Sequence, residues 1–209
     1  MKAKSDFVNQ TFDEAAIFDA FKAHLQTMSP IADHLWSLLT AAMVITSSKK
    51  GELLLEEGAV CKHIYFIYKG AFRFLYLKEN EEVTTGLFTE GICMTNMKSL
   101  TTLQPSNIFI ETLEDAIVVK LSKESMIQLY KDAPPLEGVG RVIVEHMLAD
   151  EADWKEIYTI YNPGERYRFL VNKAPQLLQK IPLQHIASFL GMRRETLSRI
   201  RSRDSKSSF

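Results

Sequence analysis

The sequence predicts an α+β protein, in which an antiparallel β-roll is followed by a long helix and a small helical C-terminal region. Three observations predict this fold class. The hydrophobic period changes from helical to two near Gly51 and becomes helical again after Ser122. A helical pattern then runs from Leu136 to about Tyr161, and Gly191 separates two short helical patterns near the C-terminus. Strands and helices grouped in this way are typical of an α+β architecture.

Two helices are predicted before the strands. Residues 11–28 carry apolar side chains at helical spacing, and Pro30 opens a second short helix through Leu39. We expect both helices to cover one side of a sheet. The first strand is predicted within residues 51–58, between two glycine turns.

Further strands are predicted along the next segments. Residues 64–77 hold two strands around a Lys-Gly turn, and a polar turn leads to a third strand at 83–88, which together form a β-meander. Residues 109–112 and 116–121 are predicted to form another hairpin. Several short strands at this spacing favour a barrel or roll.

Helices follow the strands. Ser122 can cap a helix that runs through Tyr130. The long pattern at 136–161 has apolar residues near three-four spacing, which predicts a dimerisation seam, although Asp150 interrupts it. The alternative is a single amphipathic helix that lies on its own domain. The predicted seam residues are Val139, Ile143, Met147, Trp154, Ile157 and Tyr161.

Residues 181–203 predict a helix-turn-helix that ends in a basic recognition helix. Gly191 supplies the turn, and the small Ala187, four residues earlier, lets the two helices approach closely. Leu197 and Ile200 form one apolar stripe on the second helix. The other face of that helix is then free to meet DNA.

This free face carries residue types that read base edges. Arginine can bind O6 and N7 of guanine together, and glutamate can accept from N4 of cytosine. The residues on the face are Arg193, Arg194, Glu195, Ser198, Arg199, Ser202 and Arg203. The alternative is a solvated charged helix at the end of a globular domain.

Charge is concentrated at the C-terminus. The net charge of the chain is −1, but residues 191–209 carry six cations and two acids, a net +4 that leaves −5 for the rest. We expect the acidic remainder to face away from DNA.

The segment 194–199, Arg-Glu-Thr-Leu-Ser-Arg, resembles the recognition-helix signature of the Crp-Fnr transcription regulators, in the branch common in Bacteroidetes-type bacteria. The resemblance extends upstream through residues 182–191. It implies a homodimeric, sequence-specific transcription regulator that binds double-stranded DNA, with RNA polymerase as a further partner. Many relatives carry a β-wing after this helix, but only six residues follow Arg203, so no β-wing is evident.

The same resemblance implies roles for individual residues. Arg194, Glu195 and Arg199 would read bases, whereas Gln184 and Thr196 would touch phosphate. The strand-rich region resembles the cyclic-nucleotide-binding β-roll, whose structural residues fall at Gly51, Glu52, Gly58, Phe66 and Gly70. These glycines support the fold only, because tight turns need positive φ whether or not a ligand binds.

The phosphate-binding cassette of that roll is altered in this chain. Its helical Gly-Glu-Leu is replaced at residues 95–97, and its arginine with a small pair is replaced at residues 106–108. The glutamate for the ribose and the arginine for the cyclic phosphate are therefore both missing. Because a buried phosphate without a cation is costly, the sequence argues against cyclic AMP as the effector.

Two interpretations of this pocket stay open, a degenerate site or one adapted to another ligand. The candidate effector residues are Met94, Thr95, Asn96, Met97, Ser106 and Asn107. All six could also be ordinary packing and turn residues. The effector is thus unknown, and no cofactor is assigned.

Cysteine and histidine placement excludes several functions. Cys61 and Cys93 are far apart and outside any C-x-x-C spacing, so we predict buried packing residues and exclude the iron–sulfur branch of the family. The histidines show no metal-ligand spacing and no nucleophile motif is present, so we predict no enzyme and no metal site. The competing function is a nucleotide-sensing regulatory subunit that acts on a protein partner.

We therefore divide the chain into a sensor β-roll domain, a dimerisation helix and a helix-turn-helix DNA-binding domain, at residues 1–133, 134–162 and 163–209. A chain of 209 residues that is 46% hydrophobic can bury one sizeable core and a smaller second one. No apolar run approaches the ~20 residues of a membrane span, and the N-terminus lacks the apolar segment of a signal peptide. We expect a cytoplasmic protein without a membrane partner.

Overall fold

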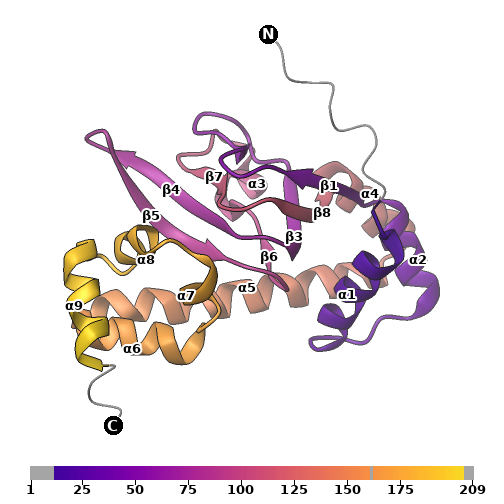
Figure 1. Cartoon of the computed structure of the whole chain (residues 1–209). Helices are drawn as coiled ribbons and strands as arrows, with labels where there is room; N and C mark the ends of the chain where they lie inside the picture. Colours follow the sequence, from indigo (N-terminus) through magenta and orange to yellow (C-terminus); the bar gives the residue numbers. More distant parts are fainter. Residues whose placement is uncertain (1–11, 161, 205–209) are drawn as a thin grey trace.

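The computed structural model describes residues 12–160 and 162–204, and it begins with two helices beside a β-roll (Figure 1). Helix α1 spans Glu14–Gln26, and the side chain of Asp13 caps it by accepting from the Ala16 amide. This agrees with the predicted helix, whose first residue lies outside the described ranges. Helix α2 spans Asp33–Ala41 rather than starting at Pro30, because its N-cap residue Ala32 has an extended backbone with ψ 147°.

The predicted antiparallel β-roll consists of two four-stranded sheets. One sheet has the order β1 (Val44–Ser48), β8 (Ala116–Ser122), β3 (His63–Lys69) and β6 (Cys93–Met94). The other has the order β2 (Leu53–Leu55), β7 (Phe109–Thr112), β4 (Phe72–Lys78) and β5 (Glu81–Phe88). Fully buried side chains from both sheets, among them Ile67, Phe72 and Ile110, form the core of the roll.

The predicted β-meander is wrong, because β3 and β4 belong to different sheets. Between them Gly70 has φ +112°, and a Cβ at this residue would lie 2.4 Å from the Cβ of Ala116. The chain therefore crosses from one sheet to the other at a glycine that no larger residue could replace. Of the predicted pairs, β4 and β5 do form a hairpin, with Glu79 and Asn80 at positive φ in its turn.

Two other strand predictions are also corrected. The hairpin predicted from β7 and β8 does not form, since β7 pairs with β2 and β4 whereas β8 pairs with β1 and β3. The strands begin at Val44 rather than near Gly51, and only Leu53–Leu55 of the segment 51–58 is extended. The missed strand β1 ends in Thr-Ser-Ser, a polar run that weakens its hydrophobic signal.

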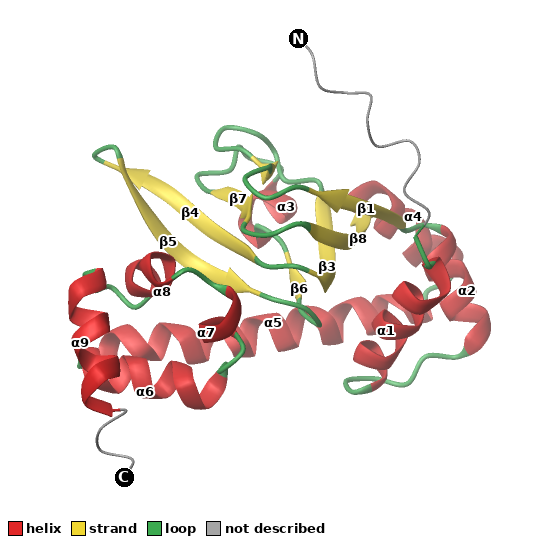
Figure 2. Ribbon diagram, viewed as in Figure 1, coloured by secondary structure: helices red, strands yellow, loops and turns green. Residues whose placement is uncertain are grey.

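The remaining elements are helices (Figure 2). Their bounds are α3 Met97–Thr102, α4 Lys123–Asp132, α5 Pro135–Ile160, α6 Pro163–Lys173, α7 Leu177–Lys180, α8 Leu183–Phe189 and α9 Arg194–Asp204. The Ser122 hydroxyl caps α4, as predicted, by accepting from the Ser125 amide at 2.9 Å. Asn162 begins α6 with a capping box, and Pro163 occupies its first turn.

Helix α5 buries two of its predicted seam residues, Val139 and Ile157, and partly buries Ile143, Met147 and Trp154. Val139 belongs to the apolar cluster that α1 and α2 form on the roll, and Ile157 is only 1% exposed. Trp154 packs edge-on against the rings of Phe169 and Phe189. These contacts agree with the amphipathic-helix alternative, and the seam residue Tyr161 lies outside the described ranges.

Residues 163–204, here called the C-terminal unit, have a core of their own that reaches the roll. Leu170, Leu177 and Leu197 are buried at its centre. The same cluster includes Ala71 and Leu87 of the roll, so the unit is packed against the roll along β5. No helix among the described residues is long and apolar enough to cross a membrane.

Candidate functional site

Helices α8 and α9 are joined by a tight turn at Gly191, which has φ +66°. The Gly191 amide donates to the Ser188 carbonyl at 3.0 Å, and the Met192 amide donates to the Ala187 carbonyl at 3.0 Å. Ala187 and Leu197 are buried where the two helices meet. The predicted roles of Gly191 as the turn and of Ala187 as the point of close approach therefore agree with the geometry.

The face of α9 that points away from this junction is exposed. The exposed side chains of α9 there are Arg194, Glu195, Thr196, Ser198, Arg199, Ser202 and Arg203, and Arg193, just before the helix, is exposed as well. Gln184, the predicted phosphate contact on α8, is exposed as well. All the predicted DNA-binding residues therefore reach the surface of two neighbouring helices, and most of them lie on one helix.

A second set of residues fixes this pair of helices to α5, and sequence reasoning missed it. The Tyr158 hydroxyl donates to the Phe189 carbonyl, and Arg166 donates to the Leu190 carbonyl at 3.1 Å. The guanidinium of Arg166 also lies 5.5 Å from the centre of the Tyr158 ring. Burial raises the pKa of Tyr158 to about 12, although the nearby charge of Arg166 lowers it, so the hydroxyl stays a donor at neutral pH.

The predicted effector residues come together around α3, and two of them, Asn96 and Ser106, hydrogen-bond to each other. Asn96 caps α3 by accepting from the Ser99 amide, and its amide group donates to the Ser106 hydroxyl at 2.8 Å. The Ser106 hydroxyl in turn donates to the Ile108 carbonyl at 2.7 Å. The Thr95 hydroxyl donates to the His63 carbonyl at 2.8 Å.

These bonds use the polar atoms that an effector would need. Asn96 and Ser106 are both buried, and Met94 is completely buried in the core of the roll. Asn107 is exposed, and Met97 is partly buried. Among the described residues, no lysine or arginine side chain hydrogen-bonds to Asn96 or Ser106. The buried polar groups of Asn96 and Ser106 therefore have hydrogen-bond partners within the fold.

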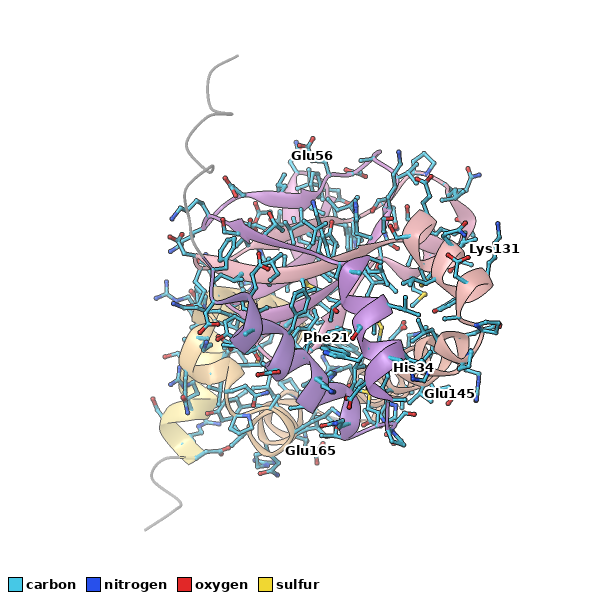
Figure 3. All side chains as sticks on the ribbon, turned by 90° about the vertical axis from the view of Figure 1, so that its right-hand side faces the viewer. Phe21, His34, Glu56, Lys131, Glu145 and Glu165 are labelled. Atoms are coloured by element: carbon cyan, nitrogen blue, oxygen red, sulfur yellow. The ribbon has the colours of Figure 1, made fainter. Side chains whose placement is uncertain are left out.

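A separate cavity of about 560 Å³ lies between the roll, α4 and α5. Its lining is mostly apolar and includes Phe21, Met97 and Ile143, together with the charged Glu145. Figure 3 looks onto this end of the molecule, where Phe21 of α1 and Glu145 of α5 are labelled. Of the predicted effector residues, only Met97 lines this cavity.

Cys61 and Cys93 are buried and free of disulfides, which confirms the prediction of packing residues. Burial raises the pKa of Cys93 to about 12, so this thiol is protonated at neutral pH. Among the described residues, no group of three or more potential metal ligands of the His, Cys, Asp and Glu types comes together.

Residues 45–133 match the family model of the cyclic nucleotide-binding domain. The roll has the fold of that domain. The match covers less than half of the chain, and it spans the two sheets together with α3 and α4. No curated protein matches the chain in sequence.

Solved structures with a similar fold include bacterial regulators. The c-di-GMP responsive global regulator CLP of Xanthomonas campestris is 16% identical, with a TM-score of 0.64, covering 85% of this chain and 93% of its own. A CooA mutant from Carboxydothermus hydrogenoformans is 15% identical, with a TM-score of 0.64, covering 89% and 84%. The Thermus thermophilus catabolite activator protein is 17% identical, with a TM-score of 0.53, covering 88% of both chains. At these identities the likeness establishes the fold, and it extends from the roll into the C-terminal helices.

Proposed function

We propose that the protein is a homodimeric, sequence-specific DNA-binding transcription regulator, in which α8 and α9 form a helix-turn-helix. The observation that carries this proposal is the exposed basic face of α9 on a tightly joined pair of helices. A helix of this width fits the major groove, where arginine can bind guanine at two points. Arg194, Glu195 and Arg199 are the proposed base readers, and Gln184 and Thr196 the proposed phosphate contacts.

The domain boundaries belong to the same proposal. Residues 1–133 would form the sensor domain, 134–162 the dimerisation helix and 163–209 the DNA-binding domain. The fold shared with the CLP regulator and the catabolite activator protein supports this division. Such a regulator would act in the cytoplasm on double-stranded DNA, with RNA polymerase as a further partner, and it would need no catalytic residue.

We propose that the dimer contact uses the outward face of α5, because two of the predicted seam residues, Val139 and Ile157, are buried within the chain. Leu148 is 54% exposed there, and the small residues Ala149 and Ala152 are exposed beside it. A two-fold dimer through this helix would present two copies of α9 to successive major grooves.

We further propose that the roll does not respond to cyclic AMP. Asn96 and Ser106 stand where a cyclic nucleotide would need a glutamate and an arginine, and each uses its polar atoms within the fold. The effector of the roll is therefore either absent or a different molecule.

The salt dependence of DNA affinity tests the proposed function against its main competitor. A regulatory subunit that acts on a protein partner would also match the cyclic nucleotide-binding model, but its basic helix would show no salt-dependent affinity for DNA. We expect the logarithm of the affinity for a labelled mixed-sequence duplex to fall linearly with the logarithm of the salt concentration. The slope should be about −0.9 for each phosphate contacted. An affinity that is undetectable at low salt would refute DNA binding.

A further inference from the structure

The C-terminal unit is held against the roll by polar contacts between α8 and β5. The backbone amide of Thr84 on β5 donates to the Ser188 hydroxyl on α8 at 3.0 Å. At the other end of the contact, Lys180 pairs with Glu90 and lies 3.4 Å from Glu114. Figure 1 shows α8 directly beneath the β4–β5 hairpin.

A buried arginine lies at the centre of this contact. Arg73 on β4 is only 4% exposed, and its guanidinium pairs with Glu82 of β5 and Glu111 of β7, each at 2.5 Å. One of its amino groups lies 2.8 Å from Nδ1 of His185 on α8. Because a guanidinium can only donate, Nδ1 must accept, and His185 must be unprotonated at that nitrogen.

Charged groups from several elements face His185. Burial is the largest cause that lowers the pKa of His185, and the positive charges of Arg73 and Lys50 also lower it. The negative charges of Glu111 and Glu82 raise it. The net result is a pKa below the ordinary value of 6.5. A proton on Nδ1 would remove the bond to Arg73 and place two cations side by side.

The same contact places acidic residues beside the predicted DNA-facing end of α8. Glu82 shares the Arg73 guanidinium with His185, and it follows Glu79 of the hairpin turn and Glu81, the first residue of β5. The first helix of a helix-turn-helix crosses the DNA backbone, so a phosphate at Gln184 would approach these carboxylates. Because Glu82 and Glu111 carry two negative charges against the one positive charge of Arg73, we expect this contact to repel a phosphate near Gln184.

The contact also contains a polar group that weakens it. The Thr84 side-chain hydroxyl is buried and finds no hydrogen-bond partner among the described residues. A buried hydroxyl without a partner costs free energy relative to its hydrated state. An opening that hydrates this hydroxyl would recover that free energy.

We propose that the Arg73–His185 contact is an autoinhibitory latch that opens when His185 is protonated. The proposal rests on the proposed DNA-binding function. Closed, the latch keeps the amino-terminal end of α8 against the acidic hairpin. Open, it frees the C-terminal unit to approach the DNA backbone. Because the pKa of His185 is lower in the closed state than in the open one, closure is strongest above about pH 6.5 and weakens as the pH falls.

Hydrogen exchange at the Thr84 amide tests the latch without DNA. We expect this amide to be protected at about pH 7.5 and to lose protection at about pH 5.5, after correction for the intrinsic exchange rate. His185→Gln keeps an acceptor for Arg73 but does not titrate. In this variant we expect equal protection at both pH values. Wild-type protection that does not change with pH, or a variant that changes in the same way, would overturn the latch.

A titration with a labelled mixed-sequence duplex at the same two pH values tests the inhibition. We expect wild-type affinity to rise at the lower pH by more than any rise seen for His185→Gln, because protonation of His185 weakens closure. Equal rises in both proteins would refute the inhibition. Protection that follows pH without any duplex binding at either pH would uphold the latch and refute the DNA-binding function.

Discussion

Single arginines on α9 are expected to differ in what they contribute to binding. Arg194 lies at the first turn of the helix and is exposed, which suits a contact to a base edge. Replacing Arg194 with alanine should cost about 1–3 kcal/mol on the preferred site and relax selectivity at one base pair. Competition titrations with single-base variants of the site measure both effects.

The matched control is Arg141→Ala, which removes an exposed arginine from α5. This change should leave site selectivity unaltered, because Arg141 pairs with Glu145 far from α9 along the chain. If Arg194→Ala weakens binding to every sequence equally, Arg194 is a phosphate contact and not a base reader.

Gly191 makes a prediction about stability. Its φ of +66° is unfavourable for any residue with a Cβ, so Gly191→Ala should destabilise the fold by about 1–2 kcal/mol. Gly138→Ala is the control, since Gly138 is inside α5 and a Cβ there would meet nothing within 4 Å. This second change should stabilise by about 0.5–1 kcal/mol. Denaturant unfolding of both variants should move in opposite directions, and parallel shifts would refute the role of the turn.

Some residues of the candidate site could be predicted from the sequence, and others could not. Gly191, Ala187 and the buried cysteines follow from local spacing and composition. The Arg73–His185 contact joins residues 112 positions apart, on a strand and a helix that each look ordinary alone. The local signal for this contact is Arg73 itself, a charged residue between two phenylalanines of a predicted strand. A charged side chain at such a position needs a partner if it is buried.

Helices proved easier to predict than the pairing of strands. The bounds of α4 and α5 were predicted to within a few residues, because capping residues and the 3.6-residue period are local. The strand partners predicted for β3 and β7 were wrong. For β3 the reason is that a Lys-Gly step looks the same in a hairpin turn and in a crossing between sheets. Gly70 makes that crossing possible, but only the packed position of Ala116 reveals it.

The elements around the pocket predict no cyclic nucleotide binding. Titration calorimetry with cyclic AMP or cyclic GMP should detect nothing tighter than about 100 μM, because Asn96 and Ser106 offer no cation and already bond to each other. Micromolar binding that also raises DNA affinity would contradict this, since linkage requires an effector to favour the DNA-competent state.

For the whole molecule, the proposed function requires a dimer through the outward face of α5. Leu148→Asp should convert a dimer near twice 23.9 kDa to a monomer at micromolar concentration, because a buried charge would face its copy across the two-fold axis. Sedimentation velocity measures the change. The control Leu38→Asp alters another exposed leucine, at 46%, on α2 and should leave the dimer intact. A wild-type monomer, or a variant that stays dimeric, would refute this face.

Selection of bound duplexes from random DNA tests the central claim most directly, because it asks for specificity and two-fold symmetry together. We expect a near-palindromic sequence, because two copies of α9 would each read one half-site. The half-sites should be separated by about one helical turn, or 10–10.5 base pairs. Recovery of no common sequence, or of a single asymmetric site bound by one chain, would contradict it.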